Sequence, residues 1–167
     1  MARFDGGKMS GELPRIPIPD SNSEPTEKMV FLQEQLVNFL GQYSLPLIEV
    51  SLVFSKFTRQ LSDALISQAK EHEEDIPEIL SKPWPVLNEG NDSVDSGPDL
   101  DAVLGALDED RMDILDTIIR TAIHATEMAL SDALMQLRQW EHLVRMQLSE
   151  AKSTGQLFSP LVIPDEW

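Results

Sequence analysis

Histidines close to carboxylates are the residues of this sequence best suited to metal chemistry. His124 lies three residues before Glu127, and Glu141 directly precedes His142. Metal sites in helical bundles use Glu-x-x-His pairs whose side chains project into the core. Around His124 this order is reversed, and no second helix offers a matching Glu-x-x-His. His72 lies within an acidic stretch, where only an unspecific metal contact is expected.

Helical periodicity places His124 and His142 on the polar side of their predicted helix. With about 100° of rotation per residue, both lie opposite its apolar stripe. We therefore predict solvated surface histidines, and no bound metal or organic cofactor that folding requires. The chain has no cysteine, so thiolate metal sites, cysteine nucleophiles and disulfides are excluded. This composition fits a reducing compartment.

Motifs of the common enzyme classes do not occur. The sequence has no Gly-rich phosphate loop, dinucleotide fingerprint, His-Glu-x-x-His or Gly-x-Ser-x-Gly. Glu49 is the carboxylate that stands alone in an apolar run, and a buried carboxyl group could act as a general acid. The simpler expectation is a helix residue that reaches solvent or a basic partner. The sequence thus favours a protein that is not an enzyme.

The charge of the chain is strongly negative. Its 167 residues include 29 acidic and 13 basic side chains, for a formal net charge of −16. Such a surface repels phosphate, which disfavours direct nucleic-acid binding and anionic membranes. The most apolar window, 45–54, is about half the length that spans a bilayer, and the first residues lack a signal peptide. We expect no membrane insertion, and a location in the cytoplasm or in an intracellularly assembled particle.

Helices are the elements expected to position these side chains. Apolar spacing predicts an all-α fold, an elongated bundle of three main helices near 24–41, 45–74 and 108–153, the last very long. Along the chain we expect five parts: an extended Pro-rich arm (1–23), a helical hairpin (24–81), an acidic Pro/Gly linker (82–98), a short helix plus the long helix (99–153), and an extended C-terminal tail (154–167).

The predicted long helix carries a narrow apolar stripe with a period close to 3.6 residues. The stripe comprises Leu115, Ile119, Ala122, Thr126, Ala129, Ala133, Leu137, Trp140, Val144, Leu148 and Ala151. The second predicted helix, placed antiparallel, leaves about a third of this long helix without a partner, and the first is shorter still. Another chain, most simply a second copy, would then cover the remainder of the stripe at Trp140, Val144 and Leu148.

Two further features suggest contact with a partner. Met128, Met135 and Met146 align on the polar side of the predicted long helix, and methionine suits adaptable contact surfaces. Apolar residues alternate with prolines at both ends of the chain, which indicates arms that lie on something. The predicted partner-binding residues are Leu13, Ile16, Ile18, Met128, Met135, Trp140, Val144, Met146, Leu148, Phe158, Leu161, Ile163 and Trp167.

Two functions remain open at this point. The favoured one is a structural or assembly subunit of a larger complex, such as a viral particle or a secretion apparatus, joined to neighbours through helix faces and arms. The alternative is a small acidic regulatory module, chaperone-like or an inhibitor, that engages a basic partner. The arms favour the first function. The net charge and the acidic stretch 89–116 favour the second.

Overall fold

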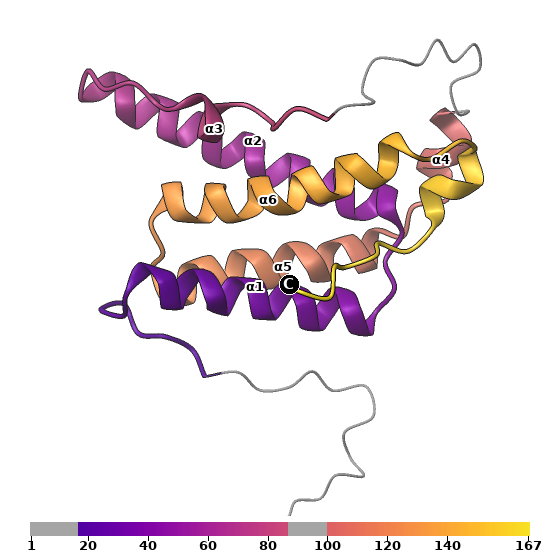
Figure 1. Cartoon of the computed structure of the whole chain (residues 1–167), viewed down its shortest axis with the longest axis horizontal. Helices are drawn as coiled ribbons and strands as arrows, with labels where there is room; N and C mark the ends of the chain where they lie inside the picture. The colour runs from indigo at the N-terminus through magenta and orange to yellow at the C-terminus, as the bar shows by residue number, and fades with distance from the viewer. Residues whose placement is uncertain (1–16, 87–99) are drawn as a thin grey trace, which may run out of the picture.

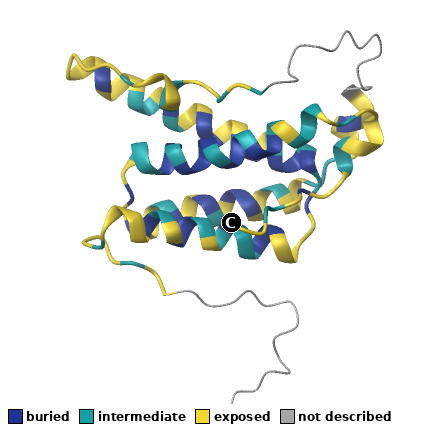
Figure 2. Cartoon of the chain, in the orientation of Figure 1, coloured by how far each residue is buried: buried dark blue, intermediate teal, exposed yellow. Residues whose placement is uncertain are grey.

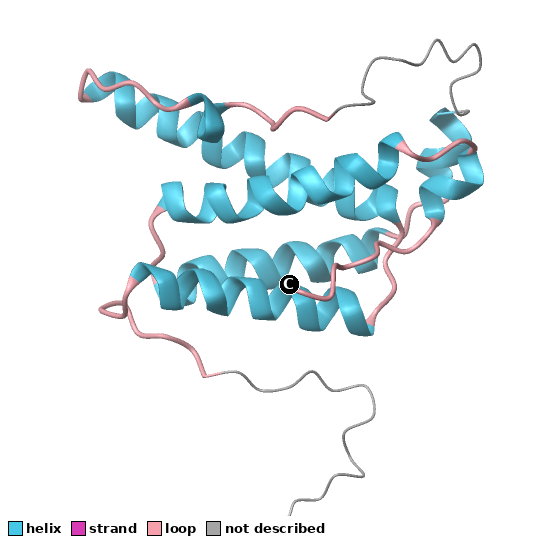
Figure 3. Ribbon diagram, in the orientation of Figure 1, coloured by secondary structure: helices cyan, strands magenta, loops and turns pink. Residues whose placement is uncertain are grey.

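The chain folds as an all-α protein, as its apolar periodicity predicted. The computed structural model describes residues 17–86 and 100–167. Four main helices surround one core: α1 (Pro25–Gln42), α2 (Leu47–Glu71), α5 (Glu109–Thr126) and α6 (Leu130–Ser149) (Figure 1). Shorter pieces are α3 (Glu78–Ser81), α4 (Leu100–Gly105) and the 3-10 helix η2 (Thr154–Phe158), and Figure 3 shows helices and loops within these ranges.

The four helices form two antiparallel pairs. α1 packs most closely on α5, and α2 packs most closely on α6 (Figure 1). The helices that follow one another in sequence, α1 with α2 and α5 with α6, therefore lie diagonally across the core. The connection from α1 to α2 and that from α5 to α6 each cross from one antiparallel pair to the other at an end of the molecule (Figure 1).

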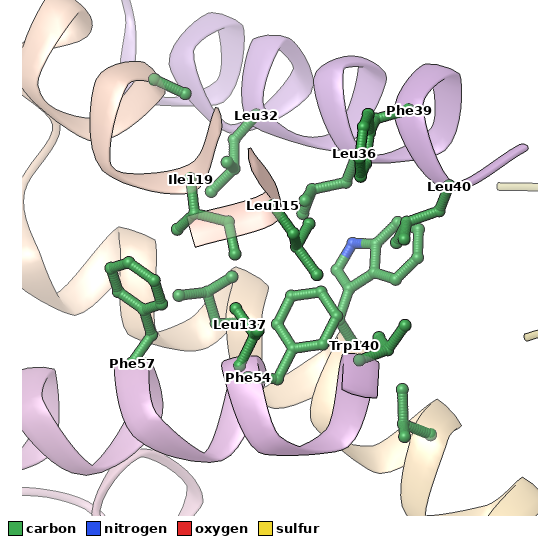
Figure 4. Close-up of a cluster of buried hydrophobic side chains, with 14 of the residues drawn as sticks. Leu32, Leu36, Phe39, Leu40, Phe54, Phe57, Leu115, Ile119, Leu137 and Trp140 are labelled. Carbon is green, nitrogen blue, oxygen red and sulfur yellow. The ribbon is translucent and has the colours of Figure 1, made fainter. Parts of the chain in front are cut away.

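The core lies between the two pairs of helices, and all four contribute to it. Figure 4 shows side chains from α1, α2, α5 and α6 meeting there, and Figure 2 shows the inward faces of these helices buried. Fully buried members are Leu32, Leu36, Phe54, Leu115, Ile119, Leu137 and Trp140. Burying each such side chain stabilises the fold by roughly 1.5–3 kcal/mol relative to leaving it exposed.

The predicted very long helix is wrong, because the chain reverses at Glu127. This residue is left-handed, with φ 52°, and α5 ends there. The amide of Glu127 donates to the carbonyl of His124 (3.2 Å), and that of Met128 donates to the carbonyl of Ile123 (3.3 Å). This pair of bonds is the Schellman termination, which usually has glycine at the left-handed position. Glutamate there gives no sequence signal of a helix end.

The reversal removes the predicted overhang. Trp140 is fully buried and Val144 is 1% exposed within this one chain. Most stripe residues on α5 and α6 are buried and face one core from two helices rather than from one, whereas Leu148 and Ala151 are half-buried and Ala129 is exposed. The prediction that another chain covers Trp140 and Val144 is therefore wrong, because both side chains are buried within this chain, where Phe54 and Trp167 pack on Trp140.

The remaining boundaries lie close to those expected. The bounds of α1 and α2 lie close to the predicted ones, although the two helices do not pack against each other as a hairpin. α2 ends at Glu71 in a second Schellman termination, with Glu73 at φ 55°. Asp108 caps α5 by accepting the amides of Asp110 and Arg111 at 3.0 and 3.3 Å. α4 lies where the sequence predicted a short helix.

The C-terminal tail is fastened to the molecule after η2, and we call residues 159–167 the C-terminal strap. An isolated antiparallel bridge joins Pro46 to Pro160. The amide of Leu47 donates to the carbonyl of Ser159 (2.8 Å), and the amide of Leu161 donates to that of Leu45 (3.3 Å). Among the described residues, no helix is both long and apolar enough to cross a bilayer.

Candidate functional site

Glu49 is fully buried and tied to Arg111, 62 residues further along the chain. Its carboxylate accepts Nε and Nη2 of Arg111 at 3.0 and 2.7 Å, and the amide of Asp108 at 3.0 Å. These hydrogen bonds hold the pKa of Arg111 above its ordinary value. The basic partner of Glu49 is therefore within the same chain, where it joins the start of α2 to the start of α5.

A second buried carboxylate joins α2, α3 and α6. Glu141 accepts Nη1 of Arg138 at 2.8 Å and the hydroxyl of Thr58 at 3.0 Å. The Nε of Arg138 donates to the carbonyl of Leu80 at 3.0 Å, which fastens the loop after α2 onto α6. Because each charged group has partners, this network has a packing role.

The other buried polar side chains are satisfied in the same way. Asp116 pairs with Lys56 on α2 and, at 2.7 Å, with Arg120 one turn further along α5. The indole Nε1 of Trp140 donates to Oε1 of Gln33 at 2.6 Å. The buried carboxylates Glu49, Glu141 and Asp116 thus serve as ion-pair partners, and none is presented with an open face for acid–base chemistry.

The histidines lie apart from one another. His124 is exposed, as predicted for the polar face, and His72 is exposed at the end of α2. His142 differs from the prediction because Trp84 packs against it, with ring centroids 5.7 Å apart. The Nδ1 atom of His142 is buried without a hydrogen-bond partner. In the ranges 17–86 and 100–167, no three His, Asp or Glu side chains are grouped as metal ligands.

The predicted methionine face is not a single surface. Met128 follows the reversal and is 6% exposed, whereas Met146 on α6 is 40% exposed. Met135 is half-buried. The three side chains align only on an unbroken helix, so the break at Glu127 separates Met128 from the other two.

The predicted contact arms have different surroundings. Leu13 and Ile16 lie outside the described residues, and Ile18 is 60% exposed. At the other end Leu161 is buried, and Ile163 and Trp167 pack on the core of the same chain. Leu148 packs there too, and Phe158 is half-buried. The C-terminal part of the predicted surface thus contacts this molecule itself.

Basic side chains in the described ranges are largely engaged internally. Carboxylates pair with Lys56, Lys82, Arg111, Arg120 and Arg138. Lys28 and Arg145 donate to the backbone carbonyls of Ser21 and Trp84. Most basic side chains of these ranges therefore have a partner within the chain, whereas Arg59, Lys70 and Lys152 are exposed without an ion pair to a described residue.

Carboxylates without an ion pair gather where α2 ends. Glu71, Glu73, Glu74 and Asp75 are exposed, and none forms a salt bridge with a described residue. The C-terminus of a helix adds partial negative charge of its own. This end of α2 therefore attracts cations.

An open hollow of about 180 Å³ lies beside these carboxylates, between the end of α2 and α3. We call it the α2–α3 hollow. The half-buried side chains of Leu65, Ile76 and Leu80 supply apolar surface, and exposed Glu74 and Asp75 also line it. Among its described lining residues there is no lysine or arginine. The hollow therefore combines apolar walls with uncompensated negative charge.

No family model, curated protein or solved structure matches this chain. The functional assignment therefore rests on its residues and their arrangement.

Sequence reasoning missed the α2–α3 hollow because its parts meet only in the folded chain. α3 is four residues long, too short for its periodicity to be read, and Glu73 stands where a glycine would have indicated the turn. The acidic run around His72 was the available signal, and sequence alone could not show the apolar surface beside it.

Proposed function

We propose that this protein is a small acidic helical module that binds a basic protein partner and has no catalytic activity. The observation that carries the proposal is the distribution of charge. Most described basic side chains form ion pairs or hydrogen bonds within the chain, and only Arg59, Lys70 and Lys152 among them are exposed without an ion pair. Carboxylates such as Glu71, Glu73, Glu74 and Asp75, by contrast, are exposed and unpaired among the described residues. Surfaces of one sign steer oppositely charged partners and speed their association.

The buried carboxylates support a binding role over catalysis. Glu49, Glu141 and Asp116 are each held by cationic side chains of the same chain. An acid–base residue needs access to the reacting group at hydrogen-bond distance. These three are committed to holding helices together.

Assembly into a larger complex is the second candidate, favoured by Ile18. This side chain is 60% exposed between Pro17 and Pro19, at the start of the described chain. Its apolar surface would be buried on a neighbouring subunit. The C-terminal arm gives this candidate less support, because Leu161, Ile163 and Trp167 are packed on their own core.

Selection from a randomised peptide library tests the first proposal. The full chain would be used as bait at roughly 0.15 M salt, where the Debye length is about 8 Å, so that diffuse attraction is reduced. We expect basic sequences to be enriched. Enrichment of neutral or acidic sequences, or no enrichment, would overturn the proposal.

Sedimentation equilibrium of the same full chain separates the two candidates. A monomer across a wide concentration range supports the binding module. A defined oligomer that dissociates when Ile18 is changed to Ser supports assembly instead.

A further inference from the structure

We propose that the α2–α3 hollow is the binding site, or seat, for an arginine side chain of the basic partner. The inference rests on the proposed function and names the site at which that function is exercised. The hollow is open to solvent and has a volume of about 180 Å³. A guanidinium with part of its aliphatic stem is of similar size.

The apolar lining suits the stem of arginine. Leu65 belongs to α2, Ile76 to the loop that follows, and Leu80 to α3. All three are half-buried, so part of each side chain still faces outward. Long basic side chains bury their methylene groups on such surface while the charged end stays at the rim.

The charged lining suits the guanidinium. Glu74 and Asp75 line the hollow and form no ion pair with a described residue. His72 also lines the hollow, whereas Lys70, the lysine or arginine nearest to them in sequence, does not. A guanidinium binds carboxylates through two parallel hydrogen bonds and is more weakly hydrated than an ammonium group. Arginine is therefore the better occupant than lysine.

Main-chain hydrogen bonds hold the loop that carries Glu74 and Asp75 beside the apolar walls. Glu73 is left-handed, and the amide of Glu74 donates to the carbonyl of Ala69 at 2.8 Å. The loop is held at its other end by α3 and by the bond from Arg138 to the carbonyl of Leu80. The main chain of the site is thus held in place before the partner arrives, which lowers the entropic cost of ordering the loop on binding.

Binding of a synthetic peptide to the full chain tests the seat. The probe is amidated Gly-Ser-Arg-Gly-Arg-Ser-Gly with a rhodamine dye on its N-terminus, and its binding is measured by fluorescence anisotropy at roughly 0.15 M salt. A second peptide carries citrulline, which has nearly the shape of arginine without its charge, and a third carries lysine. We expect the arginine peptide to bind at least fivefold more tightly than either. Equal binding of the citrulline peptide would overturn the inference.

Matched variants locate the binding. Glu74→Asn with Asp75→Asn removes two charges at the hollow, and Asp165→Asn with Glu166→Asn removes the same two charges in the exposed part of the C-terminal strap. We expect the first pair of substitutions to lower the affinity for the arginine peptide at least fivefold. The second pair should change that affinity less than twofold. If both pairs of substitutions weaken peptide binding equally, the attraction is diffuse and the α2–α3 hollow is not the arginine site. The proposal of a basic partner is then unaffected.

A filling variant tests the shape with the charges in place. Gln68 is an exposed residue of the lining, so Gln68→Phe should fold and occupy the hollow. We expect loss of arginine-peptide binding with circular dichroism unchanged. Unchanged affinity in this folded variant contradicts the seat. If the wild-type chain binds no basic peptide at all, the proposed function itself fails.

Discussion

The last residue of the chain, Trp167, packs edge-on against Trp140 at the centre of the core. Their ring centroids are 4.8 Å apart and their planes meet at 83°. Trp140 is also stacked on Phe54, with centroids 5.8 Å apart. The C-terminal strap therefore closes the core over α6.

Replacing Trp167 with Ala should lower the free energy of unfolding by about 1–3 kcal/mol. Aromatic pairs contribute about 0.5–1.5 kcal/mol beyond burial, and the half-buried ring adds apolar area. Urea denaturation followed by circular dichroism measures the change. The matched control is Val162→Ala in the same strap, which is 69% exposed and should change stability by less than about 0.5 kcal/mol. Equal effects would mean that the contact with Trp140 is unimportant.

Glycine at the reversal between α5 and α6 should stabilise the protein. A left-handed residue with a side chain costs about 1–2 kcal/mol, and the greater freedom of unfolded glycine offsets about 0.5–1 kcal/mol. Glu127→Gly should therefore raise the free energy of unfolding by about 0.5–1 kcal/mol, measured by chemical denaturation. The control Ala125→Gly, in the last turn of α5, should destabilise by up to about 1 kcal/mol. If both changes destabilise the protein, Glu127 lies within a continuous helix and the reversal is wrong.

Breaking the tie between Glu49 and Arg111 should destabilise the fold. Arg111→Met leaves a fully buried carboxylate without its cation. We expect a loss of roughly 2–3 kcal/mol, below the 3–5 kcal/mol of a fully buried pair, because Arg111 is 44% exposed. Arg59→Met, also a surface arginine, is the control and should have little effect. A similar loss in both variants would show that general charge, rather than this pair, is responsible.

The contribution of Arg111 should not depend on pH between 7 and 10. Its pKa is raised in the folded chain, so the stability that it adds is fully present below the ordinary pKa of arginine. That stability is lost only as pH rises through the still higher folded value. The difference in unfolding free energy between the wild-type chain and Arg111→Met should stay constant across this range. A steady decline toward pH 10 would argue against the pair.

Truncating Trp140 should unfold the single chain rather than separate subunits. Because this ring lies within one molecule, Trp140→Ala should cost about 3–5 kcal/mol. The melting temperature of both proteins should be independent of protein concentration. A melting temperature that rises with concentration, and loses that dependence in the variant, would show instead that Trp140 lies at a subunit interface.

The sequence by itself determined the fold class, the positions of α1, α2 and α4, and many of the buried apolar side chains. Leu115, Ile119, Leu137 and Trp140 could be identified as core residues because helical periodicity is a local property. Asp108 was readable as a helix start for the same reason, since a cap acts on the next few amides.

The tertiary structure alone decided what those buried faces pack against. A periodic stripe does not show where the chain reverses, and at Glu127 the left-handed residue is not glycine. The stripe expected to bind another chain is therefore buried within this one. Likewise Glu49 was expected to reach solvent or a basic partner, but Arg111 becomes its neighbour only when α2 and α5 are brought together. Contacts between residues so far apart depend on the packing of whole helices, which a local pattern does not record.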